Sequence, residues 1–253
     1  MADLVNELDG KVALVTGSAR NIGRATATEL ARAGAAVVIH ARESRDLCDE
    51  VVAEIEGFGG KALSCLADIR DEDAIKAMVK NAVDTFGGLD ILVNNAAMRA
   101  NQKFTEIDDE SWDRVVETGL RGCFNMSRHC IPEIIKRGGG AVISLGGMAA
   151  HQGSPRRAHV MATKAGIAGL TRGIALDHGP DNIRANIVVV GVFDTARNAN
   201  APVTSHPDDL VVPMARLGVP QDIADLIRFL VGPGATYISG QTIHVNGGIY
   251  NPH

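Results

Sequence analysis

The 253-residue sequence predicts an α/β fold: a Rossmann-type doubly wound parallel sheet of about seven strands, in a single domain. Short apolar runs alternate with segments of helical period along the whole chain. In addition, a glycine-containing turn at residues 16–23 follows the first apolar run and precedes a helical segment. Strands that alternate with helices form parallel sheets through right-handed crossovers, which place helices on both faces.

The expected elements follow one another with little interruption. Apolar runs predict strands at residues 11–15, 36–40, 62–67, 91–93, 141–145, 183–190 and 242–245. Helical period and helix-end residues predict helices at residues 24–33, 47–57, 74–86, 112–137, 159–177 and 220–230. No repeat, linker or low-complexity segment divides the chain, so one domain is expected over residues 1–253, with a lid over the pocket around residues 194–212.

Composition excludes several classes of partner. The net charge is −5 and no long basic block occurs, so nucleic acid is not expected. The longest apolar runs are too short to span a bilayer, and the N-terminus lacks a signal-peptide pattern. The eight histidines form no metal-spaced motif, so no metal is expected. The four cysteines lack close pair spacing and are typical of free thiols in the cytoplasm; they are Cys48, Cys65, Cys123 and Cys130.

The turn at residues 16–23 is the main candidate for binding. Gly17 permits a sharp turn, and Gly23 lets the helix start pack close to the strand. The amide groups and positive dipole end of the following helix suit a pyrophosphate. The candidate cofactor-binding residues of this turn are Gly17, Ser18, Arg20, Asn21, Ile22 and Gly23. The alternative is an ordinary strand-to-helix loop.

The end of the second predicted strand indicates which dinucleotide would bind. An NAD site places an acidic residue about 20 positions after the glycine turn, where it holds the ribose hydroxyls. Here that place holds Ala41 and Arg42. A guanidinium can grip a 2′-phosphate, and Arg20 in the turn is a second candidate. The two arginines therefore favour NADP(H), and the alternative is that both are solvated surface charges.

Further motifs identify a family. Asp68-Ile69, Asn94-Asn95-Ala96-Ala97, a Gly191-to-Thr195 segment and the stretch from Gly240 to Gly248 recur beside the glycine turn. On these motifs the chain resembles the short-chain dehydrogenase/reductase family nearly end to end, and within it the 3-oxoacyl-(acyl carrier protein) reductase-like members. The resemblance implies that the cofactor also contacts Asp68, Ile69, Asn95, Ala96, Lys164, Gly191 and Thr195. Three family positions differ, because Asn21, Ala97 and Val190 replace two glycines and a proline.

The resemblance also implies a catalytic Asn, Ser, Tyr and Lys, and here the chain departs from the family. The asparagine position holds Gly119, the serine position Gly147 and the tyrosine position Val160. Only Lys164 remains. Positions 147 and 160 keep the family's separation of 13 residues, which supports the register. Tyr237 and Tyr250, the only tyrosines, lie in the C-terminal segment.

Other side chains are candidates for the lost roles. His159 has a suitable pKa, but it is rotated by roughly 100° from position 160 on a helix. His151 lies in the loop expected after the fifth strand, and a solvated loop histidine is the alternative. Arg99, Arg156 and Arg157 map to loops where ligands bind in such sheets, so they favour an anionic substrate unless they are a solvated charge cluster.

Three functions therefore compete. The first is an NADP(H)-dependent oxidoreductase that reduces an activated carbonyl, including an anionic or polycyclic ketone or a quinone. The second is a non-catalytic nucleotide-binding protein or partner subunit. The third is a non-redox enzyme that uses the same pocket. The resemblance further implies a homodimer or homotetramer.

Overall fold

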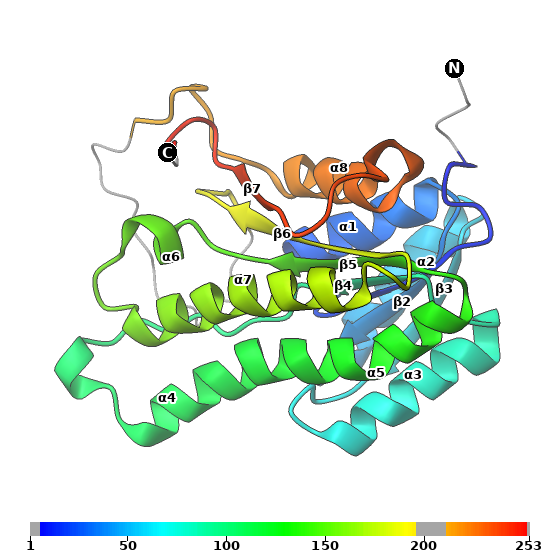
Figure 1. Ribbon diagram of the computed structural model, residues 1–253, viewed down its shortest axis with the longest axis horizontal. Helices are drawn as coiled ribbons and strands as arrows, with labels where there is room; N and C mark the ends of the chain where they lie inside the picture. The colour runs from blue at the N-terminus through cyan, green and yellow to red at the C-terminus, as the bar shows by residue number, and fades with distance from the viewer. Residues whose placement is uncertain (1–5, 196–210, 252–253) are drawn as a thin grey trace.

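The computed structural model describes residues 6–195 and 211–251, which contain one seven-stranded sheet with parallel pairings throughout (Figure 1). The order across the sheet is β3-β2-β1-β4-β5-β6-β7, as expected for a doubly wound fold. The strands are β1 (Val12–Val15), β2 (Ala36–Ala41), β3 (Lys61–Leu66), β4 (Ile91–Asn94), β5 (Gly140–Leu145), β6 (Ile183–Val190) and β7 (Thr242–Val245).

Helices cover both faces of the sheet. One face packs against α1 (Asn21–Arg32), α2 (Arg45–Gly57) and α8 (Pro220–Val231), and the other against α3 (Glu72–Phe86), α5 (Gly122–Lys136) and α7 (Ala158–His178). Successive strand residues point to opposite faces. Val15 therefore belongs to the first core and Leu14 to the second. Strands that are apolar on both faces thus contribute to two cores, one on each side of the sheet.

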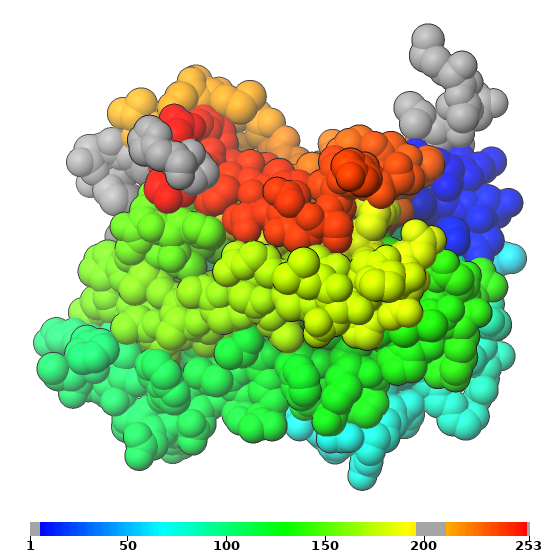
Figure 2. All heavy atoms as spheres, viewed as in Figure 1, coloured from blue at the N-terminus to red at the C-terminus, as the bar shows by residue number. Residues whose placement is uncertain are grey.

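The helix expected over residues 112–137 is divided. It begins as α4 (Asp109–Val116), continues through a π-helical turn (Glu117–Arg121) and ends as α5. Such turns insert an extra residue and occur often at functional sites. Figure 2 shows α4, α5 and α7 together as one continuous surface on the viewed face.

Short elements that periodicity did not predict complete the chain. They are α6 (Ala149–Gln152) and the 3₁₀ turns Phe104–Glu106 and Pro233–Ala235. The four cysteines are buried and free, in agreement with the sequence. Within the described ranges, no helix is long and apolar enough to cross a membrane.

The topology fixes one switch point in the sheet. Strand β1 lies between β2 and β4, and the strand order continues to β3 on one side and to β5, β6 and β7 on the other. Ligands of doubly wound sheets bind in a crevice beyond the carboxyl ends of the strands at this switch point. The turn after β1 and the segment after β4 meet there, because Asn95 donates to the Thr16 and Gly17 carbonyl oxygens.

Candidate functional site

The turn between β1 and α1 adopts the close approach that its glycines predict. Gly17 has a φ of 65°, and Asn21, which stands where the family has a glycine, has a φ of 49°. Asparagine tolerates this region better than most residues, which explains the exchange. A Cβ on Gly23 would lie 2.2 Å from the Gly17 carbonyl oxygen. The turn therefore has no room for a side chain at position 23.

The segment after β4 locks this turn from the other side of the switch point. The Asn95 side-chain amide donates to the carbonyl oxygens of Thr16 at 2.8 Å and Gly17 at 3.0 Å. In return, the Thr16 hydroxyl accepts from the amides of Asn95 and Ala96, both at 3.0 Å. The predicted residues Asn95 and Ala96 are thus brought against the glycine turn. Asn95 holds the turn through its side chain and its backbone amide, and Ala96 through its backbone amide alone.

The start of α1 fits a bound pyrophosphate. Its first turn contains no acidic residue, and among the described residues no side chain caps it. The amide groups of the first turn and the helix dipole then favour an anion at this end. Ser18 and Ile22 are buried, whereas Arg20 is exposed at the N-cap position. Ser18 has a structural role, since its hydroxyl donates to the Val15 carbonyl oxygen at 2.7 Å.

Charged residues line the crevice beyond β2 and β3. Arg42 is exposed at the end of β2, and its Nε lies 2.8 Å from a carboxylate oxygen of Glu43. Asp68 accepts from Arg70 through both the backbone amide and the guanidinium, which lowers the pKa of its carboxyl group. Ile69 is buried in the second core. That Arg20 and Arg42 bind a 2′-phosphate stays a prediction.

Lys164 lies where the carboxyl end of β5 meets α7. Its ammonium group donates to the Leu145 carbonyl oxygen at 2.5 Å. Burial lowers its pKa from 10.5 to about 8, the nearby Cys123 opposes this shift, and the positive charge of Arg99 adds to it. At neutral pH the side chain of Lys164 is still mainly the ammonium ion. Because its pKa is lowered, this ion is a stronger acid than an ordinary lysine.

Two of the other predicted catalytic positions, Gly147 and Val160, adjoin this lysine. Among the described residues, a Cβ on Gly147 would have one neighbour within 4 Å, Lys164 Cγ at 3.8 Å. Val160 is half-buried on α7, four residues before Lys164 and so on the same helix face. Gly119 is buried in the π-helical turn, where a Cβ would lie 2.3 Å from Cγ2 of Thr163. That these positions match the family's catalytic set stays a prediction.

The two candidate histidines occupy different surroundings. His159 is fully buried, burial lowers its pKa, and neither ring nitrogen has a hydrogen-bond partner in the described residues. It shares a face with Thr163, one turn later, whose methyl group faces Gly119. His159 is thus on a different helix face from Val160 and Lys164, as its rotation predicts.

His151 was expected in a loop, and that expectation is wrong, because His151 lies in the short helix α6. The amides of the first α6 turn bond back to Gly147 and Met148, and this closes a helical turn that no periodicity signals. Its ring makes an edge contact with that of His244, with centroids 4.6 Å apart, and lies 6.2 Å from that of Tyr250. These two partners come from β7 and the C-terminal segment, so sequence spacing did not indicate the cluster.

The remaining predicted residues lie at the edge formed by β6 and β7. A Cβ on Gly191 would lie 2.6 Å from the Asn246 Cα atom, so the two chain segments require a glycine there. Thr195 is half-buried at the last described position before the gap. The expected lid over residues 194–212 lies mostly outside the described residues.

Arg156, another predicted residue, contacts the segment after β4. Its Nε donates to the side-chain oxygen of Asn101 at 3.1 Å.

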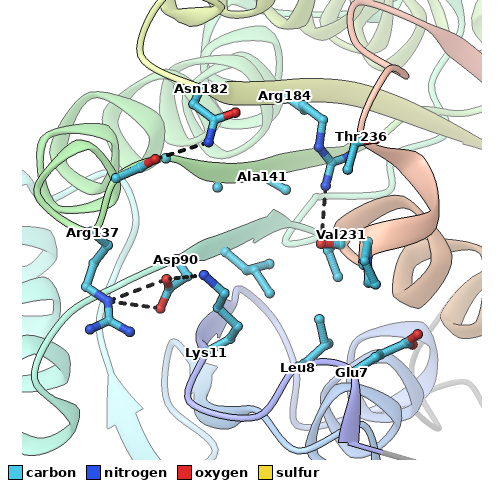
Figure 3. Close-up of a pocket in the computed structure, with 16 residues that line it drawn as sticks. Glu7, Leu8, Lys11, Asp90, Arg137, Ala141, Asn182, Arg184, Val231 and Thr236 are labelled. Atoms are coloured by element: carbon cyan, nitrogen blue, oxygen red, sulfur yellow. Dashed lines mark hydrogen bonds and ion pairs between the residues drawn. The ribbon is translucent and has the colours of Figure 1, made fainter. Parts of the chain in front are cut away.

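A pocket of about 270 Å³ lies at the opposite edge of the sheet (Figure 3). Charged side chains in this pocket are paired. The buried carboxylate of Asp90 forms ion pairs with Lys11 at 3.1 Å and with Arg137 at 3.3 Å. Arg184 donates to the carbonyl oxygens of Leu230 and Val231 at the end of α8. These contacts tie the amino ends of the strands together. The pocket is therefore distinct from the crevice at the carboxyl edge, and no metal-binding cluster occurs in residues 6–195 and 211–251.

Comparison with known proteins agrees with this geometry. A family model described as enoyl-(acyl carrier protein) reductase matches residues 17–250. A 3-oxoacyl-(acyl-carrier-protein) reductase of Staphylococcus aureus, FabG, is 38% identical over 242 residues, which cover 95% of this chain and 98% of that protein. A dehydrogenase/reductase structure from Sinorhizobium meliloti has a TM-score of 0.90, 35% identity and 98% coverage of both chains. A short chain dehydrogenase of Burkholderia cenocepacia, in complex with NADP, has a TM-score of 0.86 and 33% identity, covering 96% of this chain and 99% of its own.

Proposed function

The chain belongs to the short-chain dehydrogenase/reductase family, and we propose that it is an atypical NADP(H)-dependent oxidoreductase that reduces an activated carbonyl group. The observation that carries the proposal is the contrast within one crevice. The glycine turn has no space for a side chain at Gly23, whereas Gly147 and Val160 place no hydroxyl beside Lys164. We therefore infer that the glycine turn and the segments bonded to it, here called the nucleotide cradle, bind the cofactor without the expected proton donor beside it.

NADP(H) is the cofactor that suits the residues present. The start of α1 lacks acidic residues in its first turn and suits the pyrophosphate, and Arg42 and Arg20 supply positive charge where a 2′-phosphate would lie. No carboxylate occupies the end of β2 itself, although Glu43 beside Arg42 competes for its guanidinium. The NADP bound to the Burkholderia cenocepacia relative supports this choice. The other cofactor contacts proposed are those of Asp68, Ile69, Asn95, Ala96, Lys164, Gly191 and Thr195.

The residues beside the carbonyl site decide which substrates can react. When bound, NADPH supplies the hydride, and the protein has to orient the carbonyl and provide for charge on its oxygen. A positioned acid typically contributes about a hundred- to ten-thousandfold, and a valine at position 160 contributes none of this. A quinone or a phenol-conjugated ketone stabilises its own oxyanion and takes its proton from water. Such a substrate therefore suffers least from the missing hydroxyls.

Positive charge and open space further define the substrate. Lys164 remains an ammonium at neutral pH, and Arg99 adds to the local positive potential. Preorganised cations stabilise negative charge that develops in the transition state. The space beside Gly147 admits a bulkier group than a serine would. We therefore favour a polycyclic or anionic carbonyl compound.

A second candidate is a non-catalytic NADP(H)-binding protein or partner subunit. It rests on the same lack of hydroxyls at positions 147 and 160. For either function we propose a cytoplasmic homodimer or homotetramer. Exposed apolar side chains on α4, α5 and α7 support assembly through these helices; they are Trp112, Phe124, Ile135 and Leu176.

Equilibrium binding followed by turnover separates these functions. NADPH and NADH are titrated against the protein, and NADPH consumption is then followed with a quinone, a polycyclic ketone and an aliphatic ketone. We expect NADPH to bind more tightly than NADH and to be consumed with the first two substrates. Arg42→Ala should weaken NADPH binding and leave NADH binding unchanged.

The failures are equally informative. NADPH binding without consumption of any substrate indicates the non-catalytic function. No binding of either nucleotide contradicts both candidates and favours a non-redox enzyme in the same pocket.

A further inference from the structure

His40 at the end of β2 joins three segments of the nucleotide cradle. Its side chain is 2% exposed. The Gly17 amide donates to Nδ1 of the imidazole at 3.0 Å, and Nε2 lies 2.9 Å from the Ala67 carbonyl oxygen. Ala67 directly precedes Asp68 and Ile69, the predicted adenine contacts. One ring therefore connects the glycine turn to the end of β3.

The two contacts specify one state of the ring. Nδ1 accepts a hydrogen bond, so it carries no proton, and Nε2 must carry the hydrogen that it donates to Ala67. This is the neutral Nε2–H tautomer. The backbone of His40 adds to the junction, because its amide donates to the Ser18 hydroxyl at 2.8 Å and its carbonyl accepts from the Ser18 amide at 2.8 Å.

We propose that His40 is a positioning residue that, in its neutral form, holds the glycine turn closed for the dinucleotide and, when protonated, releases it. Protonation puts an N–H on Nδ1, directly against the N–H of Gly17. Two donors then face each other without an acceptor, in a site closed to water. The turn has to open to relieve this conflict, and NADP(H) binding is lost with it. The inference rests on the proposed NADP(H) site.

The charges around the ring bear on its titration. Burial lowers the pKa of His40, while the hydrogen bond to Ala67 and the negative charge of Asp68 oppose this shift. Asp68 is itself engaged by Arg70. From the other elements, the turn presents the backbone of Gly17 and the hydroxyl of Ser18, with Arg20 beyond them at the start of α1. Arg42, directly after the strand that carries the ring, is paired with Glu43.

The direction of the pH effect follows from this lowered pKa. The open or unfolded chain takes up a proton near the ordinary histidine value of 6.5, whereas the closed turn resists it. The closed turn is therefore most stable, relative to the open or unfolded chain, above that value. Its relative stability decreases as pH falls below that value. One linked proton changes an equilibrium by up to about tenfold per pH unit.

Two substitutions test the two hydrogen bonds of the His40 ring separately. In His40→Asn, the amide oxygen replaces Nδ1 as an acceptor for Gly17, and nothing in the side chain titrates. In His40→Gln, the amide nitrogen replaces Nε2 as a donor to Ala67. The matched control is His178→Asn, which removes a histidine at the end of α7 that pairs with Asp181. NADPH affinity is measured for all four proteins between pH 7.5 and pH 5.

We expect wild type and His178→Asn to lose about tenfold more NADPH affinity than His40→Asn over this range. The 2′-phosphate also titrates near pH 6 (about the value for phosphate groups), but it does so equally in every variant. We expect His40→Gln to bind NADPH more weakly than His40→Asn at pH 7.5, because only the latter keeps the acceptor for Gly17. Parallel pH profiles for wild type and His40→Asn would overturn the proposal.

A measurement without nucleotide separates this inference from the proposed function. Imidazole ¹⁵N NMR of the nucleotide-free protein should show His40 with a hydrogen on Nε2 and none on Nδ1 at pH 7.5. The Gly17 amide resonance should shift as His40 titrates. The opposite tautomer, or a Gly17 amide resonance that does not shift as His40 titrates, contradicts the proposed role of His40 even if NADPH binds. Absence of NADPH binding with the expected NMR result contradicts the proposed function alone.

Discussion

The crevice has two ends that tolerate change very differently. At the nucleotide end, a Cβ on Gly23 would meet the Gly17 carbonyl oxygen at 2.2 Å. At the other end, the nearest described neighbour of a Cβ on Gly147 would be Lys164 Cγ at 3.8 Å. The glycine at position 23 is required by backbone packing, and the glycine at position 147 is not.

This difference separates the proposed nucleotide site from the positions where a proton donor is expected. Hydrogen bonds from the side chains of Asn95 and His40 to the backbone of the turn hold the turn, the segment after β4 and the end of β2 together. A binding site held in this way is lost if its packing is altered. The side chains at positions 147 and 160, by contrast, can change without disturbing the fold. The two ends can therefore be tested separately.

The largest effect should come from filling the nucleotide end. Gly23→Ala forces a methyl group against the backbone of the turn, and overpacking typically costs about 1–3 kcal/mol. If that cost falls on the closed turn, NADPH affinity drops by up to about a hundredfold. Isothermal titration with NADPH checks this. Gly57→Ala is the control, because its Cβ would have no neighbour within 4 Å at the end of α2.

An unchanged affinity in Gly23→Ala would show that the turn moves freely. In that case the cradle is not set by close packing, and the contrast between the two ends disappears.

A gain is expected from refilling the other end. In Gly147→Ser with Val160→Tyr, a hydroxyl and a phenol return beside Lys164, whose ammonium lowers the pKa of a nearby phenol. Reduction of an aliphatic ketone should rise by at least about a hundredfold, the usual contribution of a positioned acid. Steady-state NADPH consumption measures it. Val160→Phe with Gly147→Ser is the control, because it adds the ring without the hydroxyl.

Placing an asparagine at position 119, where the family has one, needs a second substitution. Gly119→Asn alone would press on the Thr163 methyl group at 2.3 Å and should lower the melting temperature. Thr163→Ala removes that methyl, so the pair should recover stability. No gain in ketone reduction from the refilled site would mean that the pocket differs from the family's beyond its polar groups.

A smaller, two-sided effect is expected at Lys164. Its pKa of about 8 lies below the ordinary 10.5, so between these values the unfolded chain binds a proton that the folded chain does not. Stability should therefore rise with pH across this window, and Lys164→Met should raise the melting temperature at pH 7. The same change should weaken NADPH binding by about tenfold, the usual loss for a charged hydrogen bond.

Lys80→Met removes an exposed lysine on α3 and serves as the control. If Lys164→Met lowers both stability and affinity, the lysine is a structural residue of the β5 end rather than a binding residue.

Much of this arrangement could be predicted from the sequence, because it depends on local patterns. Alternating runs predicted the parallel sheet, and the spacing around Gly17 and Gly23 predicted the turn. The role of His40 could not be predicted, since it depends on where β3 ends relative to the turn. The contacts of His151 with His244 and Tyr250 join segments about 100 residues apart and leave no local signal. Likewise, the π-helical turn at Gly119 has no periodicity that marks it.

The most direct test of the central claim is single-turnover oxidation of bound NADPH, followed by stopped-flow loss of nicotinamide fluorescence. A quinone and an aliphatic ketone are mixed in turn with the wild-type protein already saturated with NADPH. Our account predicts a rate constant at least about a hundredfold larger for the quinone, because only the ketone needs the missing acid. Equal rate constants for the two substrates, or no oxidation by either while NADPH remains bound, would contradict it.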